Sequence, residues 1–485
     1  MIFSKTILMD LNVRVWLALS LAGASFVSVS VQSVMPYIAG TFSIGDSNAI
    51  WVLTFLVINW ALGILLMPHI SKKIGTQRTY KLSLALLIMG SVACGVSHSF
   101  IIMLVARGMQ GIGAGLLVPL AQVFFISNIR NRHVAMSVWS FSMILPFFFG
   151  PAIAGFLAIT LSYRLLFLFP VAIFIVSLFV VSRSLPVSDE PLIHRFDWLG
   201  LICLYTFLLS SMIVLSEGER LGWFSSFFIE CFMLITLVSF IVFISIENRV
   251  RYPLLPFRLF TLPFSIGLFG ISVLWSLYMA WSTLILLVSG YILSYNGYYS
   301  GLVLLPCGVG YILGTAFYNF VSKHIAHIYL AIASILFMFM FLLMIRVSPM
   351  SDARTLAFPL VFLGFSVAFM FVPFNLIIFS GVNQDNHRIA SAVSNFIRVY
   401  LSSVAVEILH ISWQRSFAVF YANANSMYFY GVLPSLHTQI SIATKTSMSL
   451  AVNLCSEASM AGCVFILILI IAFTYITHTK QKAID

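Results

Sequence analysis

The chain has 485 residues, of which 61% are hydrophobic and only 8% are charged. Soluble domains carry about 25% charged residues, so this composition indicates an integral membrane protein. The formal net charge of +11 does not indicate nucleic-acid binding, because the sequence has no basic tail, no Lys/Arg-rich run and no low-complexity tract.

Apolar runs of the length that crosses a bilayer, about 20 residues, follow one another along the whole chain. The first is too long for a signal peptide and has no clear cleavage site, so we expect it to stay in the mature protein. The pattern predicts an all-α membrane protein with fourteen spans, at residues 14–37, 49–70, 79–97, 100–124, 134–159, 164–182, 196–216, 226–246, 262–286, 298–320, 327–346, 354–380, 389–412 and 456–478.

The connections between these runs carry an uneven share of positive charge. With the N-terminus in the cytoplasm, alternate connections place 17 Lys and Arg residues on the cytoplasmic side and 6 on the other side. Positive residues favour the cytoplasmic side of a membrane. The sequence therefore predicts that both termini are cytoplasmic, and the positive excess is a topology signal.

No motif for catalysis or metal binding stands out. The 6 cysteines are scattered without a CxxC pair, so we expect neither a disulfide framework nor a metal site. A GxxxxGK[ST] loop is also missing, so ATP is not the direct source of energy. These absences predict a protein that is not an enzyme and needs no cofactor.

The fourth run contains the stretch ARGMQGIGAGLLVP, which places Arg107 inside the membrane. A charge at the centre of a bilayer costs roughly 3 kcal/mol, so it is expected to face the protein interior with polar partners. Gln110 lies on the same helix face, and Gly111 and Gly115 have the spacing that lets another helix pack closely. Two interpretations stay open. In the functional one, Arg107 tunes proton coupling or holds an anionic group across the cavity; in the other, it binds neighbouring carbonyls and fixes helix packing.

Several motifs resemble those of the major facilitator superfamily, in particular its fourteen-helix EmrB/QacA type of drug:proton antiporter. The fifth-helix pattern G-P-x-x-x-G is matched by Gly150, Pro151 and Gly155. The remaining matches are Leu104, Arg107, Gln110, Gly111 and Gly113 in the fourth run, Phe196 to Gly200 at the seventh, FVPFNLIIFSG at 371–381, and Ser394 to Arg398 in the thirteenth.

This resemblance implies the major facilitator fold, with two six-helix bundles and two linking helices. The expected division is an N-terminal bundle at 1–185, linking helices at 186–258 and a C-terminal bundle at 259–485. The last part includes a long external segment at 413–455, expected to be a solvated loop with an amphipathic helix, or else to cover the external mouth or touch a partner. Such proteins rock their bundles around a site near the bilayer midplane.

The implied function is proton-coupled export of hydrophobic or amphiphilic compounds, including drugs, across a bacterial inner membrane. A periplasmic adaptor and an outer-membrane channel are partners implied by the resemblance alone. Two rivals stay open: a dedicated exporter of a siderophore or other metabolite, and a membrane receptor that has lost transport. Substrate profiling would separate them.

Two positions depart from the family pattern. The acid usual in the first helix is replaced by Val27, and the acid of the loop between helices two and three is replaced by Lys72. Of that loop motif, Gly75 and the positive character remain. The family's proton carrier in the first helix is therefore missing, and the loop latch must be different or weaker here.

Glu407 is the one acid deep inside a bundle run. Burial disfavours the charged form of a carboxyl group, so this side chain is suited to binding and releasing a proton. His410 lies three residues on and titrates near neutral pH. We hypothesise that Glu407, with His410, replaces the missing acid in coupling; the alternative is that Glu407 lies near the external end of its helix and is simply hydrated.

The residues Gly150, Pro151 and Gly155 are expected to form a tight bundle contact that sets which side opens, or else ordinary small-residue packing.

Other polar or amphipathic residues inside the spans are candidates for lining a cavity. They are Gln32, Trp51, Asn59, Gln110, Asn375 and Arg398.

Overall fold

The computed structural model describes residues 11–184, 196–291, 295–320, 326–344, 353–380 and 382–429, with isolated residues between 446 and 464. Within these ranges every regular element is a helix. We use "first half" for α1 to α9, "linking hairpin" for α10 and α11, and "second half" for α12 to α17.

The first half begins with a span broken by a 3₁₀ turn, followed by five further spans. Pro36 is the second residue of α2, which follows this turn directly. The elements are α1 (Leu11–Val29), η1 (Ser30–Val34), α2 (Met35–Phe42), α3 (Asp46–Ala49), α4 (Trp51–Ile74), α5 (Thr76–Val96), α6 (Phe100–Asn128), α7 (Arg132–Thr160), α8 (Leu165–Leu168) and α9 (Val171–Ser184).

The linking hairpin and the second half continue the same alternation of long apolar helices. The elements are α10 (Trp198–Leu221), η2 (Trp223–Ser225), α11 (Phe227–Glu247), η3 (Phe257–Leu259), α12 (Leu262–Tyr291), α13 (Gly297–Leu302), α14 (Leu305–Phe320), α15 (Ala326–Met344), α16 (Ala353–Ser380), η4 (Gln384–Asn386) and α17 (His387–Phe429).

Membrane spans occur where the apolar runs predict them. Among the described residues, 11 helices are long and apolar enough to cross a membrane, and Leu165–Val181 and Ile332–Met344 are shorter apolar helices. Most of the fourteenth predicted span, 456–478, lies outside the described residues. One of its described residues, Ser459, accepts a hydrogen bond from the Trp281 indole at 2.9 Å. This contact places the start of that segment against α12.

Local sequence explains several helix boundaries. Side chains of Asn131, Asp197 and Asn296 accept hydrogen bonds from the first backbone amides of α7, α10 and α13, which are otherwise unpaired at a helix start. The predicted motif residue Gly75 is the single residue between α4 and α5, with φ +86°. A residue with a side chain is strained at that φ, so glycine is required for this sharp turn.

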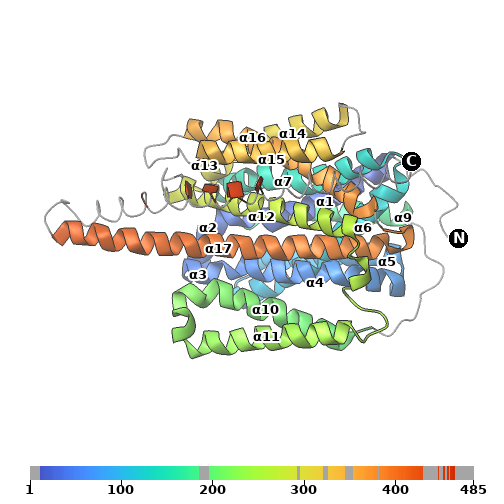
Figure 1. Cartoon of the computed structure of the whole chain (residues 1–485), viewed down its shortest axis with the longest axis horizontal. Helices are drawn as coiled ribbons and strands as arrows, with labels where there is room; N and C mark the ends of the chain where they lie inside the picture. Colours follow the sequence, from blue (N-terminus) through green and yellow to red (C-terminus); the bar gives the residue numbers. More distant parts are fainter. Residues whose placement is uncertain are drawn as a thin grey trace, which may run out of the picture.

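Figure 1 shows the helices as a long bundle, with the linking hairpin along one edge beside α4 and α17. We call the end where α1 begins the proximal end, and the end where α4, α6 and α13 begin the distal end. The two halves meet along two seams: α4 packs on α17, and α7 packs on α13 and α14.

Helix α17 is longer than the sequence analysis predicts. The predicted span ends at 412, but the helix continues to Phe429, and Figure 1 shows it running past the rest of the bundle. The first part of the segment expected to be a solvated loop with an amphipathic helix, residues 413–429, therefore continues the helix of the preceding span. Its 43 residues include neither proline nor glycine, so nothing in the backbone chemistry stops the helix where the apolar pattern ends.

Candidate functional site

Arg107 is completely buried in α6 and bonded to two other helices. Its Nε donates to the carbonyl of Val52 at 3.0 Å, and one terminal nitrogen donates to the carbonyl of Val27 at 3.1 Å. The same nitrogen donates to Gln110 Oε1 at 2.9 Å, and the guanidinium carbon lies 5.8 Å from the centre of the Phe167 ring. The guanidinium therefore fastens α1 and α4 to α6.

The bonding of Arg107 favours the interpretation that it fixes helix packing. One feature, a terminal nitrogen unpaired among the described residues, is left to support a functional role. Val27, where the family acid is missing, supplies its backbone carbonyl in place of a carboxylate. Gln110 donates in turn to Ser91 Oγ at 2.9 Å, which extends the network to α5. The second terminal nitrogen of Arg107 has no partner within the described part of the chain.

Replacing Arg107 by alanine is expected to destabilise the protein. It removes three hydrogen bonds to a charged group, each contributing about 1.5–3 kcal/mol. Even a loss of about 3 kcal/mol corresponds to a fall of about 3 °C in the unfolding temperature of a chain of this length. Thermal unfolding in detergent measures this, and Arg107→Lys should recover part of the loss. An unchanged unfolding temperature combined with lost transport would instead assign Arg107 a functional role.

The glycines of α6 make close helix contacts on two faces. A Cβ added at Gly111 or Gly115 would collide with the α4 backbone at Leu56 and Trp60. One added at Gly113 would collide with the carbonyl of Ser83 in α5. The predicted close approach at Gly111 and Gly115 is thus directed at α4.

Gly150, Pro151 and Gly155 lie where α7 meets other elements. An added Cβ at Gly150 would meet Ser30 Oγ of η1 at 2.5 Å. At Gly155 it would meet the backbone of Gly297 and Tyr298, at 2.5–2.6 Å, and these residues begin the second half's α13. A Cβ added at Gly301 of α13 would likewise collide with the backbone of Pro151 and Ala152. This stretch therefore closes the α7–α13 seam at the distal end.

A central cavity lies between the two halves, on the side of the linking hairpin. Its volume is ≈ 140 Å³, which is enough to hold several ordered waters. Most of the lining is apolar or aromatic. The first half contributes Ser28, Gln32, Leu53, Thr54, Trp60 and Met143 to the lining, and α10 contributes Leu208 and Met212. The second half contributes Trp275, Arg398, Tyr400 and Glu407.

Arg398 and Glu407 are the two charged residues in the described lining of this cavity. Both belong to α17, nine positions apart, which is about 14 Å along the helix axis. Arg398 is 2% exposed and Glu407 is 7% exposed. The cavity therefore has a cation toward its proximal end and a carboxyl group toward its distal end.

Arg398 is held by aromatic rings. Its guanidinium carbon lies 4.7 Å from the ring centre of Phe371, 5.6 Å from Trp275 and 5.7 Å from Trp139. A cation over aromatic faces is stabilised by the ring quadrupoles. One terminal nitrogen donates to Asn395, while Nε has no partner within the described residues. Arg398 thus lines the cavity with a buried Nε that has no hydrogen-bond partner among the described residues.

His410 does not share the central cavity with Glu407. It lines a second cavity of ≈ 180 Å³ at the distal end, with Ile50, Ser216, Glu219, Arg220 and Gln414. Ile50 lines both cavities. The three-residue spacing correctly puts both side chains on one side of α17, but the two belong to different compartments.

Four predicted cavity residues lie elsewhere. Gln110 is in the Arg107 network. Asn59 is buried in α4 and donates to the carbonyl of Phe55 at 2.7 Å. The Trp51 indole donates to Glu217 of α10 at 3.1 Å, near the boundary between the two cavities. Asn375 is buried in α16 and belongs to a polar cluster described next.

A polar cluster at the proximal end joins the two halves, and sequence reasoning missed it. Gln122 of α6 donates to Asn375 Oδ1 at 2.9 Å and accepts from Asn395 at 2.8 Å and from Ser391. Ser137 Oγ donates to Asn319 at 3.1 Å across the α7–α14 contact. The polar residues Gln122 and Asn395, each inside an apolar span, were the available signal.

A many-spanning helical bundle with a cavity between its two halves is the architecture of a secondary transporter. The model of the Major Facilitator Superfamily matches residues 15–407, and the chain belongs to that superfamily.

Curated relatives and solved structures agree with this assignment. The chain is 25% identical to the fatty acid resistance protein FarB of Neisseria gonorrhoeae over 409 residues, which cover 82% of this chain and 81% of the relative. It is 27% identical to the multidrug export protein EmrB of Escherichia coli, covering 82% and 80% of the two chains. The crystal structure of the POT family transporter PepTSo has the same fold, with a TM-score of 0.64 at 13% identity, covering 96% of this chain and 98% of that chain.

Proposed function

We propose that this protein exports hydrophobic or amphiphilic compounds across the bacterial inner membrane in exchange for protons, with its proximal end in the cytoplasm. The observation that carries the proposal is the central cavity, which has apolar and aromatic walls and a charged residue toward each end. Such a lining binds apolar compounds of varied shape, while a few polar groups orient them. Relatives named for multidrug export and fatty acid resistance also support an export function.

Transport in this proposal occurs by rocking of two bodies, residues 1–185 and 259–485, around the cavity. The cluster around Gln122 closes the proximal end, because it links α6 to α16 and α17. The glycine contact between α7 and α13 closes one seam at the distal end. Opening either end requires breaking one set of these contacts.

Glu407 is the proposed proton carrier. It is nearly buried, it lines the cavity, and it accepts no hydrogen bond from a described residue. A carboxyl group without partners in an apolar place is more stable when protonated, so proton loss and substrate occupancy influence each other. His410 takes the proton on the distal side in this scheme, because it lines the next compartment.

The proposal extends to partners outside the membrane. A periplasmic adaptor and an outer-membrane channel come from the resemblance to EmrB-type transporters. The part of α17 beyond Ser412 gives such an adaptor a helix to contact. Co-purification with and without residues 413–429 tests this part.

The function is tested in inside-out vesicles that pump protons inward. Vesicles containing the protein should accumulate hydrophobic dyes and amphiphilic acids, and nigericin, which removes the pH gradient, should stop the uptake. Uptake of a single metabolite with no dye transport would favour a dedicated exporter. No uptake of any compound from a broad panel would overturn the proposal and favour a receptor.

A further inference from the structure

The central cavity and the distal cavity are consecutive compartments along α10 and α17. Met212 lines the first and Ser216 the second on α10, a step of about 6 Å along the helix. Glu407 and His410 make the same transition on α17 within about one turn. Ile50, just before α4, borders both. A compound leaving the central cavity toward the distal side therefore passes this boundary.

A hydrogen-bonded pair stands at the boundary. The Trp51 indole of α4 donates to Glu217 of α10, and Arg220 binds the other oxygen of that carboxylate at 2.6 Å. Glu217 is 7% exposed, so it is a buried carboxylate held by a cation and an indole. Ile50 lines both compartments, and its neighbour Trp51 bonds to Glu217, which follows Ser216 of the second compartment. We call Ile50, Trp51 and Glu217 the partition.

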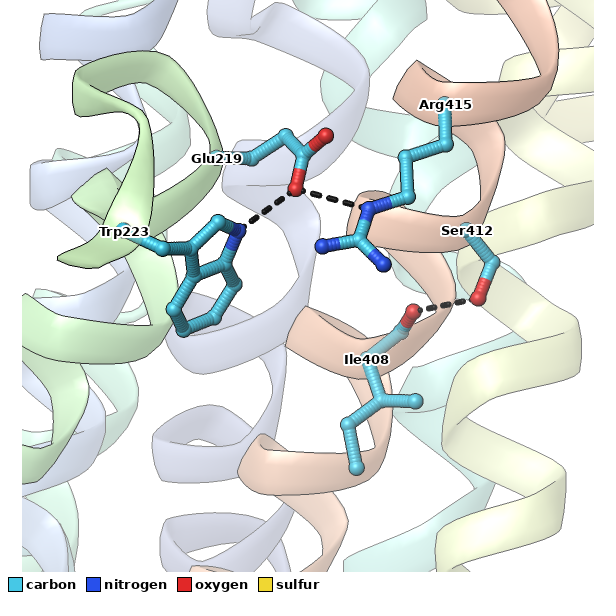
Figure 2. A network of polar contacts seen from close by, with 5 residues as sticks. All are labelled: Glu219, Trp223, Ile408, Ser412 and Arg415. Atoms are coloured by element: carbon cyan, nitrogen blue, oxygen red, sulfur yellow. Dashed lines mark hydrogen bonds and ion pairs between the residues drawn. The ribbon is translucent and has the colours of Figure 1, made fainter. Parts of the chain in front are cut away.

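Two further bonds attach α10 to the second half. Tyr400 of α17 donates to Ser211 at 3.0 Å beside the central cavity. Nearer the distal end, Arg415 of α17 donates to Glu219 at 2.9 Å, and the same carboxylate oxygen accepts from the Trp223 indole at 2.7 Å (Figure 2). Helix α10 therefore bonds to both halves, to α4 through Glu217 and to α17 through Ser211 and Glu219.

These attachments are suited to being broken and remade. Helix α10 packs extensively on α11 but touches α4 and α17 at few positions. The Arg415–Glu219 pair is exposed on the arginine side, and exposed ion pairs contribute only about 0–1 kcal/mol. The linking hairpin thus packs mainly within itself, and it is joined to the transport core by a few polar contacts and by apolar ones, such as Phe207 against Tyr400 at 5.6 Å between ring centres.

We propose that the distal end of α10 is the exit gate of the central cavity: the linking hairpin moves away from α4 and α17, the partition at Trp51 and Glu217 opens, and the bound compound passes through the distal cavity. The inference rests on the proposed export function, and it assigns the linking helices a part in the transport path itself. Glu217 is a positioning residue of this gate, since it fixes Trp51.

A reversible cross-link tests the gate. In a cysteine-free chain, Glu219→Cys with Arg415→Cys joins α10 to α17 through a reducible thiosulfonate linker. Dye uptake by vesicles is expected to fall about tenfold or more on cross-linking, since a blocked opening step limits the whole cycle, and to return on reduction. The matched control is Ser210→Cys with Thr236→Cys, whose hydroxyls lie 2.8 Å apart between α10 and α11. That link stays within the hairpin and should leave uptake unchanged.

The outcomes separate the gate from the export function. Loss of uptake in the 219–415 pair alone supports the gate, and full uptake by fully cross-linked protein overturns it. The cysteine-free parent tests export by itself. Spin labels on the same 219–415 pair need no transport: a second, longer distance in proteoliposomes supports the gate, and one short distance under all substrate and pH conditions overturns it.

Discussion

Replacing Glu407 by glutamine is expected to reduce uptake driven by a pH gradient to the level of empty vesicles. Glutamine keeps the size and hydrogen-bonding capacity of the side chain but cannot bind and release a proton. The cavity remains intact, so exchange of labelled for unlabelled substrate without a gradient should continue. Inside-out vesicles measure the first quantity, and substrate-loaded proteoliposomes measure the second.

Two variants control this result. Glu407→Asp keeps a titratable group in the cavity and should retain part of the driven uptake. Glu230→Gln removes a carboxyl group from an exposed position in α11 and should have no effect. Full gradient-driven uptake by Glu407→Gln would rule out Glu407 as the carrier and leave the route of the proton to other residues.

Replacing Gly155 by valine is expected to abolish transport by preventing closure of the α7–α13 seam. A Cβ there would lie within 2.6 Å of the Gly297 backbone, far inside van der Waals contact, and two backbone segments cannot yield as a flexible side chain does. The distal end should therefore stay open. A cysteine at the cavity position Thr54 should then react faster with a membrane-impermeant maleimide added outside cells.

The control for Gly155 is Gly40→Val, since an added Cβ at Gly40 meets nothing within 4 Å. That variant should transport and label like the parent. If Gly155→Val also transports normally and the Thr54 cysteine reacts at the parent rate, the seam is not part of the closing contact. Membrane content measured by immunoblot separates this result from a failure to fold.

Much of the architecture follows from the sequence, because apolar length and glycine spacing are local properties. The thirteen runs up to residue 412 coincide with helices in the described residues. The pairing of Arg107 with Gln110 follows from a three-residue spacing, which puts two side chains on one helix face. The close contacts of Gly111 and Gly115 follow from the absence of a side chain.

The set of residues that meet at the site could not be predicted from the sequence. Residue spacing fixes which side chains share a helix face, but it does not fix which neighbouring helix that face contacts. Trp51 was a candidate for the cavity lining, and its partner Glu217 lies 166 positions along the chain. Gln122 has partners at Asn375 and Asn395, which are more than 250 positions away. Likewise, the partition between Glu407 and His410 comes from other helices, and α17 gives no local sign of it.

The length of α17 has a mechanical consequence. Its 43 residues measure about 65 Å, against roughly 30 Å for the hydrocarbon core of a bilayer. The helix begins at the proximal end and continues past the distal end as one rod. If α17 tilts by about 10° within the membrane, a point on the helix about 25 Å outside the membrane moves by roughly 4 Å. The far end of α17 is thus a lever arm, and a soluble protein touching it would sense whether the transporter is open inward or outward without contacting the lipid.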